Sequence, residues 1–186
     1  MAAADQPAGR PGTGCPAGLA AAIRAAVACR ADWAQTASLV AGALRAHLPG
    51  PGILTARQRA GRAGGYASEV LHAEPDGSFS VCSLVWRPGQ QTPIHDHVTW
   101  CVLAVLQGSE HEELYELRDN GTCLAPAGRS ENLPGQVSAF APPGDIHRVR
   151  NSSDQVSISL HVYGADITRL GSSVRRTYDL PVLTPA

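Results

Sequence analysis

The feature that most constrains the fold is a change of pattern near residue 66, after which apolar and polar residues alternate in short runs. Residues 78–86 alternate for most of their length, which predicts a β-strand. Turn residues at 74–78 and 119–121 predict hairpins. Further strands are expected at residues 95–97, 100–107, 112–117, 136–140, 147–150 and 156–163. About eight short strands at this spacing predict a mainly β chain, either a sandwich or a barrel.

Two helices are expected before this β region. Leu19 and Ile23 recur at helical spacing in the first, as do Trp33, Val40 and Leu44 in the second. Proline and glycine at residues 47–52 end the second helix. The chain is therefore expected to have a disordered tail at 1–14 and a single domain at 15–186. That domain divides into helices at 15–48, a barrel core at 66–165 and a C-terminal arm at 166–186.

Composition narrows the classes of function. A formal net charge of −1 gives no general attraction to nucleic acid or to an anionic membrane, and no apolar run approaches transmembrane length. The alanine-rich run at 19–29 resembles a short signal segment, but Arg24 lies in its middle, and we interpret it as an amphipathic helix. Five cysteines without CxxC spacing are typical of reduced thiols. We therefore expect a cytoplasmic protein, monomeric or weakly homo-oligomeric.

Three histidines form a candidate metal site. His95 and His97 are one residue apart in an extended segment, so both imidazoles point to one face while Asp96 points away. His147 follows a proline- and glycine-rich turn and is the candidate third ligand. Such a set suits non-haem iron, manganese or zinc. Each histidine alone is more simply a core hydrogen-bonding residue, whereas the three together favour a metal site.

The spacing around these histidines resembles the two motifs of the cupin superfamily. The first motif is matched by Gly89, His95, His97, Cys101 and Gly108, and the second by Gly135, Pro142, Gly144, His147 and Asn151. The resemblance implies a double-stranded β-helix, or jelly-roll barrel, with the N-terminal α-helices packed outside. Cys101 stands where cupins usually have a glutamate ligand, which implies a site of three histidines.

This departure narrows the resemblance to the cysteine dioxygenase family, which the Ser159-Leu-His161-Val-Tyr163 segment also resembles. The resemblance implies that His95, His97 and His147 bind Fe(II), and that both atoms of O2 pass to the sulfur of a small thiol to give a sulfinic acid. Three neutral ligands leave the ferrous ion its full charge, which favours binding of a thiolate.

Further site residues come from the same resemblance. Ser159, His161 and Tyr163 share one strand face and imply a catalytic relay in which serine orients histidine and histidine orients tyrosine. Cys101 is the candidate thioether partner of Tyr163, although a free buried thiol is the simpler state.

Recognition of the substrate is the open part of the prediction. The family arginine that follows a tyrosine is absent from the segment 66–70, so Arg169, Arg175 and Arg176 are the candidates for binding a carboxylate. Trp100 is a candidate pocket residue, although core packing is the usual role of an aromatic in a barrel. The missing arginine favours 3-mercaptopropionate or another small thiol over strict cysteine specificity.

Two other functions remain open. One is a cupin metalloenzyme that uses the same histidines on a non-thiol substrate. The other is a non-catalytic cupin that binds a small ligand. The Ser159–His161–Tyr163 segment favours the dioxygenase, because a binding protein has no need of a proton relay beside its metal.

Overall fold

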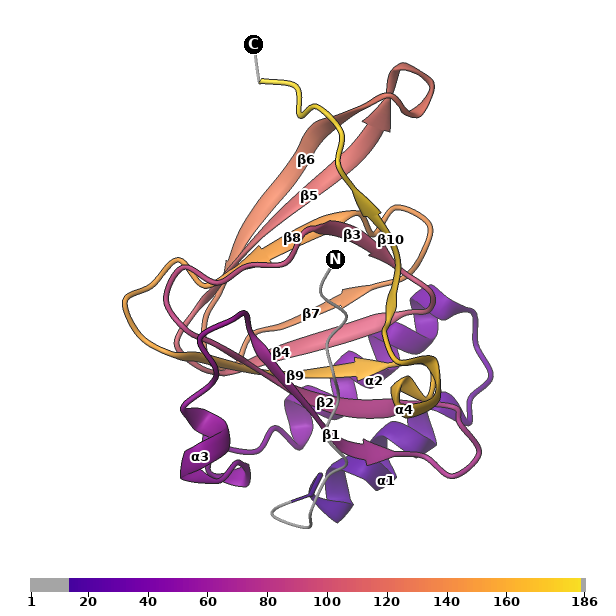
Figure 1. Cartoon of the computed structure of the whole chain (residues 1–186). Helices are drawn as coiled ribbons and strands as arrows, with labels where there is room; N and C mark the ends of the chain where they lie inside the picture. The colour runs from indigo at the N-terminus through magenta and orange to yellow at the C-terminus, as the bar shows by residue number, and fades with distance from the viewer. Residues whose placement is uncertain (1–13, 185–186) are drawn as a thin grey trace.

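The computed structural model describes residues 14–184, in which ten strands form two five-stranded antiparallel sheets that face each other (Figure 1). One sheet has the order β1 (Ala67–Ala73), β2 (Ser80–Trp86), β9 (Ser157–Tyr163), β4 (Cys101–Gln107) and β7 (Val137–Phe140). The other has the order β10 (Val174–Tyr178), β3 (Ile94–His97), β8 (His147–Arg150), β5 (Glu110–Arg118) and β6 (Cys123–Asn132). The predicted mainly β fold, a double-stranded β-helix with helices outside, is confirmed. The tail predicted at 1–14 lies outside the described residues except for Gly14.

Two helices cover the outer face of the first sheet, α1 (Ala17–Val27) and α2 (Trp33–Ala46) (Figure 1). The Asp32 side chain caps α2 by accepting a hydrogen bond from the Gln35 backbone N–H at 2.8 Å. The remaining helical segments are short: η1 (Pro51–Ile53), α3 (Ala56–Arg59), η2 (Asp119–Gly121) and α4 (Ile167–Leu170). Among residues 14–184, no helix is long and apolar enough to cross a membrane.

The first sheet is buried on both faces, and the two faces differ in chemistry. On β9, Ile158, Leu160 and Val162 point outward into the apolar core beneath the helices. The alternate residues, Ser159, His161 and Tyr163, point into the barrel. Because the helices and the outer face supply most of the apolar core, the interior of the barrel can carry polar groups.

The chain segments before β4 and after β9 approach each other closely, which explains why residue 164 is a glycine. Gly164 donates its backbone N–H to the Trp100 carbonyl at 3.1 Å. A Cβ atom at Gly164 would lie only 2.2 Å from Trp100 Nε1. Only glycine fits there, since the indole of Trp100 occupies the space that a side chain would need.

The second sheet contains β6, one of three strands, with β1 and β10, that the sequence pattern did not delimit. β6 pairs with β5 along their length, and the two form a hairpin that projects beyond the barrel (Figure 1). Pro126 and Gly128 lower its strand propensity, and both are tolerated because β6 is an edge strand with mostly exposed residues. The predicted C-terminal arm at 166–186 contains α4 and then β10, which pairs with β3.

Candidate metal centre

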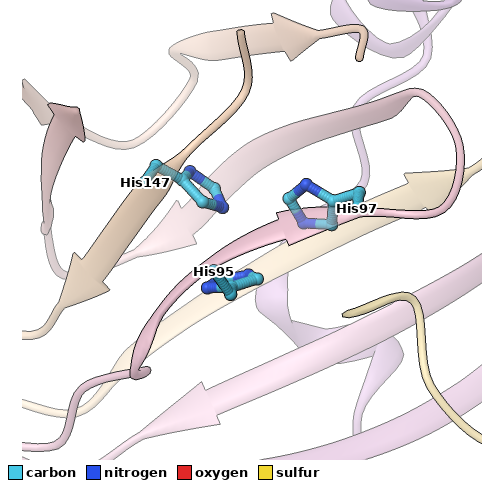
Figure 2. A group of neighbouring side chains, drawn as sticks. All are labelled: His95, His97 and His147. Carbon is cyan, nitrogen blue, oxygen red and sulfur yellow. The ribbon is translucent and has the colours of Figure 1, made fainter. Parts of the chain in front are cut away.

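The three predicted histidine ligands lie together inside the barrel. His95 and His97 project from β3 and His147 from the neighbouring β8, and their rings face a common point (Figure 2). One ligand nitrogen from each residue lies within 4.8 Å of the others. His95 and His147 are directly paired across the two strands, so the sheet itself fixes the spacing of the rings.

The other ring nitrogen of each histidine is held by an acceptor. Nδ1 of His95 lies 3.0 Å from the Pro93 carbonyl oxygen, and Nδ1 of His97 lies 3.0 Å from Oδ2 of Asp145. Nδ1 of His147 lies 2.6 Å from Oε1 of Glu112. A neutral imidazole that donates from Nδ1 carries its lone pair on Nε2. All three Nε2 atoms are therefore free to bind a metal, and these outer partners fix the ring orientations.

The electrostatics of the site fit a metal ion. Burial, with the neighbouring histidines, lowers the pKa of both His95 and His147 to about 3, so both are neutral at physiological pH. Nε2 of His147 is buried and has no hydrogen-bond partner among the described residues, which would be costly without a ligand. Three imidazole nitrogen donors suit a first-row divalent transition metal.

The carboxylates behind the ligands differ in their electrostatics. Burial alone would raise the pKa of Asp145, but hydrogen bonds from the ring and backbone N–H groups of His97 hold it below its usual value. Burial raises the pKa of Glu112 to about 7. Asp145 is therefore ionised at neutral pH and places a negative charge next to Nδ1 of His97.

The residue between the two ligands of β3 anchors that strand to β10. Asp96 is buried, and its Oδ2 accepts hydrogen bonds from Arg175 and from the Tyr178 hydroxyl, the latter at 2.9 Å. Arg176 lies 3.7 Å from the same oxygen. Two of the arginines considered for the substrate thus face Asp96, because Asp96 points away from the metal site towards β10.

The structure brings Ser159, His161 and Tyr163 together as a hydrogen-bonded chain. Ser159 Oγ lies 3.1 Å from His161 Nε2, and the Tyr163 hydroxyl lies 3.3 Å from His161 Nδ1. Burial lowers the pKa of His161 to about 3 and raises that of Tyr163 well above its usual value. Both groups are therefore neutral at pH 7, and the Tyr163 hydroxyl can act as a hydrogen-bond donor.

Cys101 lies beside this chain. It is paired with Tyr163 across β4 and β9, and its Sγ lies 3.9 Å from His161 Nδ1. Burial raises the pKa of this thiol well above its usual value, so it stays protonated and packs as a small apolar group.

A cavity of about 1030 Å³ connects the histidines with the mouth of the barrel. Tyr163 and Trp86 line it, whereas Trp100 packs in the core beneath the helices. Arg169 also lies away from the cavity, in an ion pair with Asp166 on the surface. The proposed roles of Trp100, Arg169, Arg175 and Arg176 in substrate binding therefore have no support from their positions. Each has another partner: the core, Asp166 or Asp96.

Two arginines that the sequence predicts only as part of a basic connector do line the cavity, Arg57 on α3 and Arg62 after it. The segment that carries Arg62 is held at the mouth by Arg87, which donates to the Ala60 carbonyl at 3.0 Å, and by Gln90, which donates to the Arg62 carbonyl at 2.9 Å. No periodicity reveals these arginines, because their approach to the site depends on how this segment folds over the barrel.

The carboxylates that bind the ligating histidines could have been identified from the sequence. Asp145 precedes His147 by two residues, and Glu112 lies in a predicted strand, where every second residue shares a face. Glu110 lies on the same face, is fully buried and was also overlooked.

The chain resembles one known protein family in sequence and several solved structures in fold. The family model described as cysteine dioxygenase type I matches residues 64–171, more than half of the chain. Among solved structures, the chain is similar to a cupin superfamily protein from Desulfitobacterium hafniense, at 13% identity and a TM-score of 0.44, over 62% of this chain and 86% of that one. It is also similar to an uncharacterised conserved protein with a double-stranded β-helix domain from Klebsiella pneumoniae, at 16% identity and a TM-score of 0.45, over 61% and 90% of the two chains.

Proposed function

We propose that this chain, which belongs to the cysteine dioxygenase type I family, is an Fe(II)-dependent dioxygenase of small thiols. The reaction adds both atoms of O2 to the sulfur, so that R–SH and O2 give the sulfinic acid R–SO2H. The observation that carries the proposal is the combination, in one cavity, of three histidine nitrogen donors with the Tyr163 hydroxyl.

Within this proposal, His95, His97 and His147 hold the ferrous ion through their Nε2 atoms. When bound, the ion brings thiolate and O2 together and supplies the electron transfer between them. The three imidazoles add no negative charge, so ionisation of a thiol beside the cation is favoured. Pro93, Glu112 and Asp145 keep the rings oriented by accepting from their Nδ1 atoms.

The relay then has a defined task. Tyr163 lines the cavity and remains protonated at neutral pH because burial raises its pKa. Its hydroxyl can donate a hydrogen bond to the oxygen or sulfur of the reactants. His161 holds the tyrosine oxygen, and Ser159 holds the imidazole from its other side.

Arg57 and Arg62 support a thiol that carries a carboxylate. Both line the cavity that contains the histidines, and a guanidinium group binds a carboxylate with two parallel hydrogen bonds. Arg57 forms no ion pair or side-chain hydrogen bond within residues 14–184, so its donors are available to a ligand. We therefore place 3-mercaptopropionate, cysteine and similar small thiol acids first among the substrates.

The test is O2 consumption by protein that is purified anaerobically and loaded with Fe(II). The thiols to compare are cysteine, 3-mercaptopropionate, mercaptosuccinate, cysteamine and ergothioneine. We expect uptake of one O2 per thiol consumed, with a sulfinic acid as product. Uptake with none of these thiols would overturn the proposal.

Two variants connect the activity to the site. His147→Ala should lose iron, whereas His111→Ala, on the opposite face of β5, should retain it. Tyr163→Phe should retain iron and slow turnover by roughly 10²-fold or more, the usual range for a lost proton donor. Loss of iron from Tyr163→Phe would instead indicate that the tyrosine maintains the structure of the site.

A further inference from the structure

Glu110 is a buried carboxyl group to which no role has so far been given. It is the first residue of β5, its exposed fraction is 0%, and neither carboxyl oxygen has a hydrogen-bond partner among the described residues. An unpaired buried carboxylate is costly, and burial raises the pKa of Glu110 to about 7. A polar group kept in such a position calls for an explanation.

Two groups at the serine end of the relay act on Glu110. The two uncharged groups that favour its ionised form are the Ser159 hydroxyl and the Trp86 indole N–H. Trp86 Nε1 in turn lies 3.4 Å from Ser159 Oγ. Glu110 is therefore close enough to the Ser159 and Trp86 end of the relay for these groups to act on its ionisation.

The number of donors and acceptors limits how these groups can be connected. An indole N–H can only donate, so Trp86 fills one lone pair of Ser159 Oγ. If His161 Nε2–H fills the other, the serine hydrogen needs a different acceptor, and the carboxylate of Glu110 is the one beside it. If Glu110 is instead protonated, it can donate to Ser159, and the serine hydrogen turns to His161 Nε2.

We propose that Glu110 is the fourth member of the relay, a positioning residue whose carboxyl group decides which ring nitrogen of His161 carries the hydrogen. With Glu110 ionised, His161 is protonated at Nε2, and its Nδ1 accepts from the Tyr163 hydroxyl. With Glu110 protonated, every hydrogen bond of the chain reverses. His161 then donates from Nδ1 to the tyrosine oxygen, and the Tyr163 hydroxyl is free to donate into the cavity. The inference deepens the proposed function, since it concerns the same relay.

Few charged groups near Glu110 influence whether its carboxyl group is ionised. Among the described residues, Glu112 of the same strand is the charged group that acts on Glu110, and its repulsion favours the protonated form. Burial also raises the pKa of Glu112 to about 7, so this repulsion is present only where Glu112 is itself ionised. From β9, His161 stays neutral because burial lowers its pKa to about 3. On β6, Asn132 is paired with Glu110 and is uncharged, and Arg150 of β8 is exposed to solvent.

The experiment reads the tautomer of His161 directly. The full chain, labelled with ¹⁵N-histidine, is studied by long-range ¹H–¹⁵N NMR, both metal-free and with one equivalent of diamagnetic Zn(II). The His161 signals are identified by their loss in His161→Gln. At ~pH 8.5, well above the pKa of Glu110, we expect the Nε2–H tautomer, and at ~pH 5.5 the Nδ1–H tautomer.

Glu110→Met supplies the matched variant, because it keeps the side-chain length and removes the acceptor. Ser159 then has His161 Nε2 as its acceptor, so the Nδ1–H tautomer should be found at both pH values. Glu116→Gln, an exposed residue of the same strand, should behave as the wild type. One and the same tautomer in wild type at both pH values would overturn the inference, even if Glu110→Met failed to fold. Because the readout needs neither iron nor turnover, it is independent of whether the chain oxidises thiols.

Discussion

Asp145→Asn is the most informative perturbation of the metal centre. One oxygen of Asp145, Oδ2, accepts from both the backbone N–H of His97 at 2.9 Å and its ring Nδ1 at 3.0 Å. The other oxygen, Oδ1, is buried and has no partner in the described part of the chain. An asparagine can keep its carbonyl at the Oδ2 position, which preserves both hydrogen bonds but removes the negative charge. Its amide group then occupies the Oδ1 position and finds no acceptor.

The size of the effect follows from this geometry. Loss of an outer partner of a ligating histidine typically weakens metal binding about 10–100-fold, or ~1.4–2.7 kcal/mol. We expect the upper part of this range, because the change removes a charge next to His97 and also leaves a buried donor unpaired. The fold should survive, since Asp145 and asparagine have nearly the same volume.

The assay is anaerobic calorimetric titration of the metal-free protein with Fe(II), and with Co(II) as a second probe. Asp154→Asn, at an exposed loop position, is the control and should bind both metals as the wild type does. An affinity of Asp145→Asn within about threefold of the wild type would refute the idea that this carboxylate tunes and orients His97.

Three further predictions concern substrate, pH and packing. Arg57→Met should raise the KM for a carboxylate-bearing thiol about tenfold or more while leaving that for cysteamine unchanged, as measured by O2 uptake, with Arg169→Met as the unaffected control. The metal-free protein should lose stability as the pH falls from about 6.5 towards 3, measured by urea unfolding. Its buried histidines have lowered folded-state pKa values, so the unfolded state binds more protons in that window, and each contributes up to ~1.4 kcal/mol per pH unit. These histidines are His95, His147 and His161. Glu110 and Glu112 have raised folded-state pKa values and oppose the loss above about pH 4.5, so the loss should be steepest between about 4.5 and 3, and a flat profile there would contradict the neutral burial of the histidines. Gly164→Ala should cost ~3 kcal/mol or more in thermal unfolding because its Cβ would meet Trp100, whereas Gly42→Ala, with open space in α2, should stabilise by ~0.5–1 kcal/mol.

Much of the centre could be predicted from the sequence because it depends on local geometry. The strand period alone puts His95 and His97 on one face and aligns Ser159 with Tyr163. The arginines that line the cavity could not be predicted from the strand period. Arg175 lies on a strand next to β3, but its side chain contacts Asp96. The arginines that do line the cavity, Arg57 and Arg62, come from a short helix and the segment after it, far away in the sequence.

The pairing of β10 with β3 has a consequence for the order in which the protein is made. β3 has four residues and shares a single residue pair with β8, so most of its strand partners come from β10. Asp96 is also anchored only when Arg175 and Tyr178 are present. During translation, the ligand strand therefore emerges from the ribosome about eighty residues before its support does. The strand that carries His95 and His97 should therefore be fully supported only after synthesis has passed Tyr178, so the candidate metal site is completed late in translation.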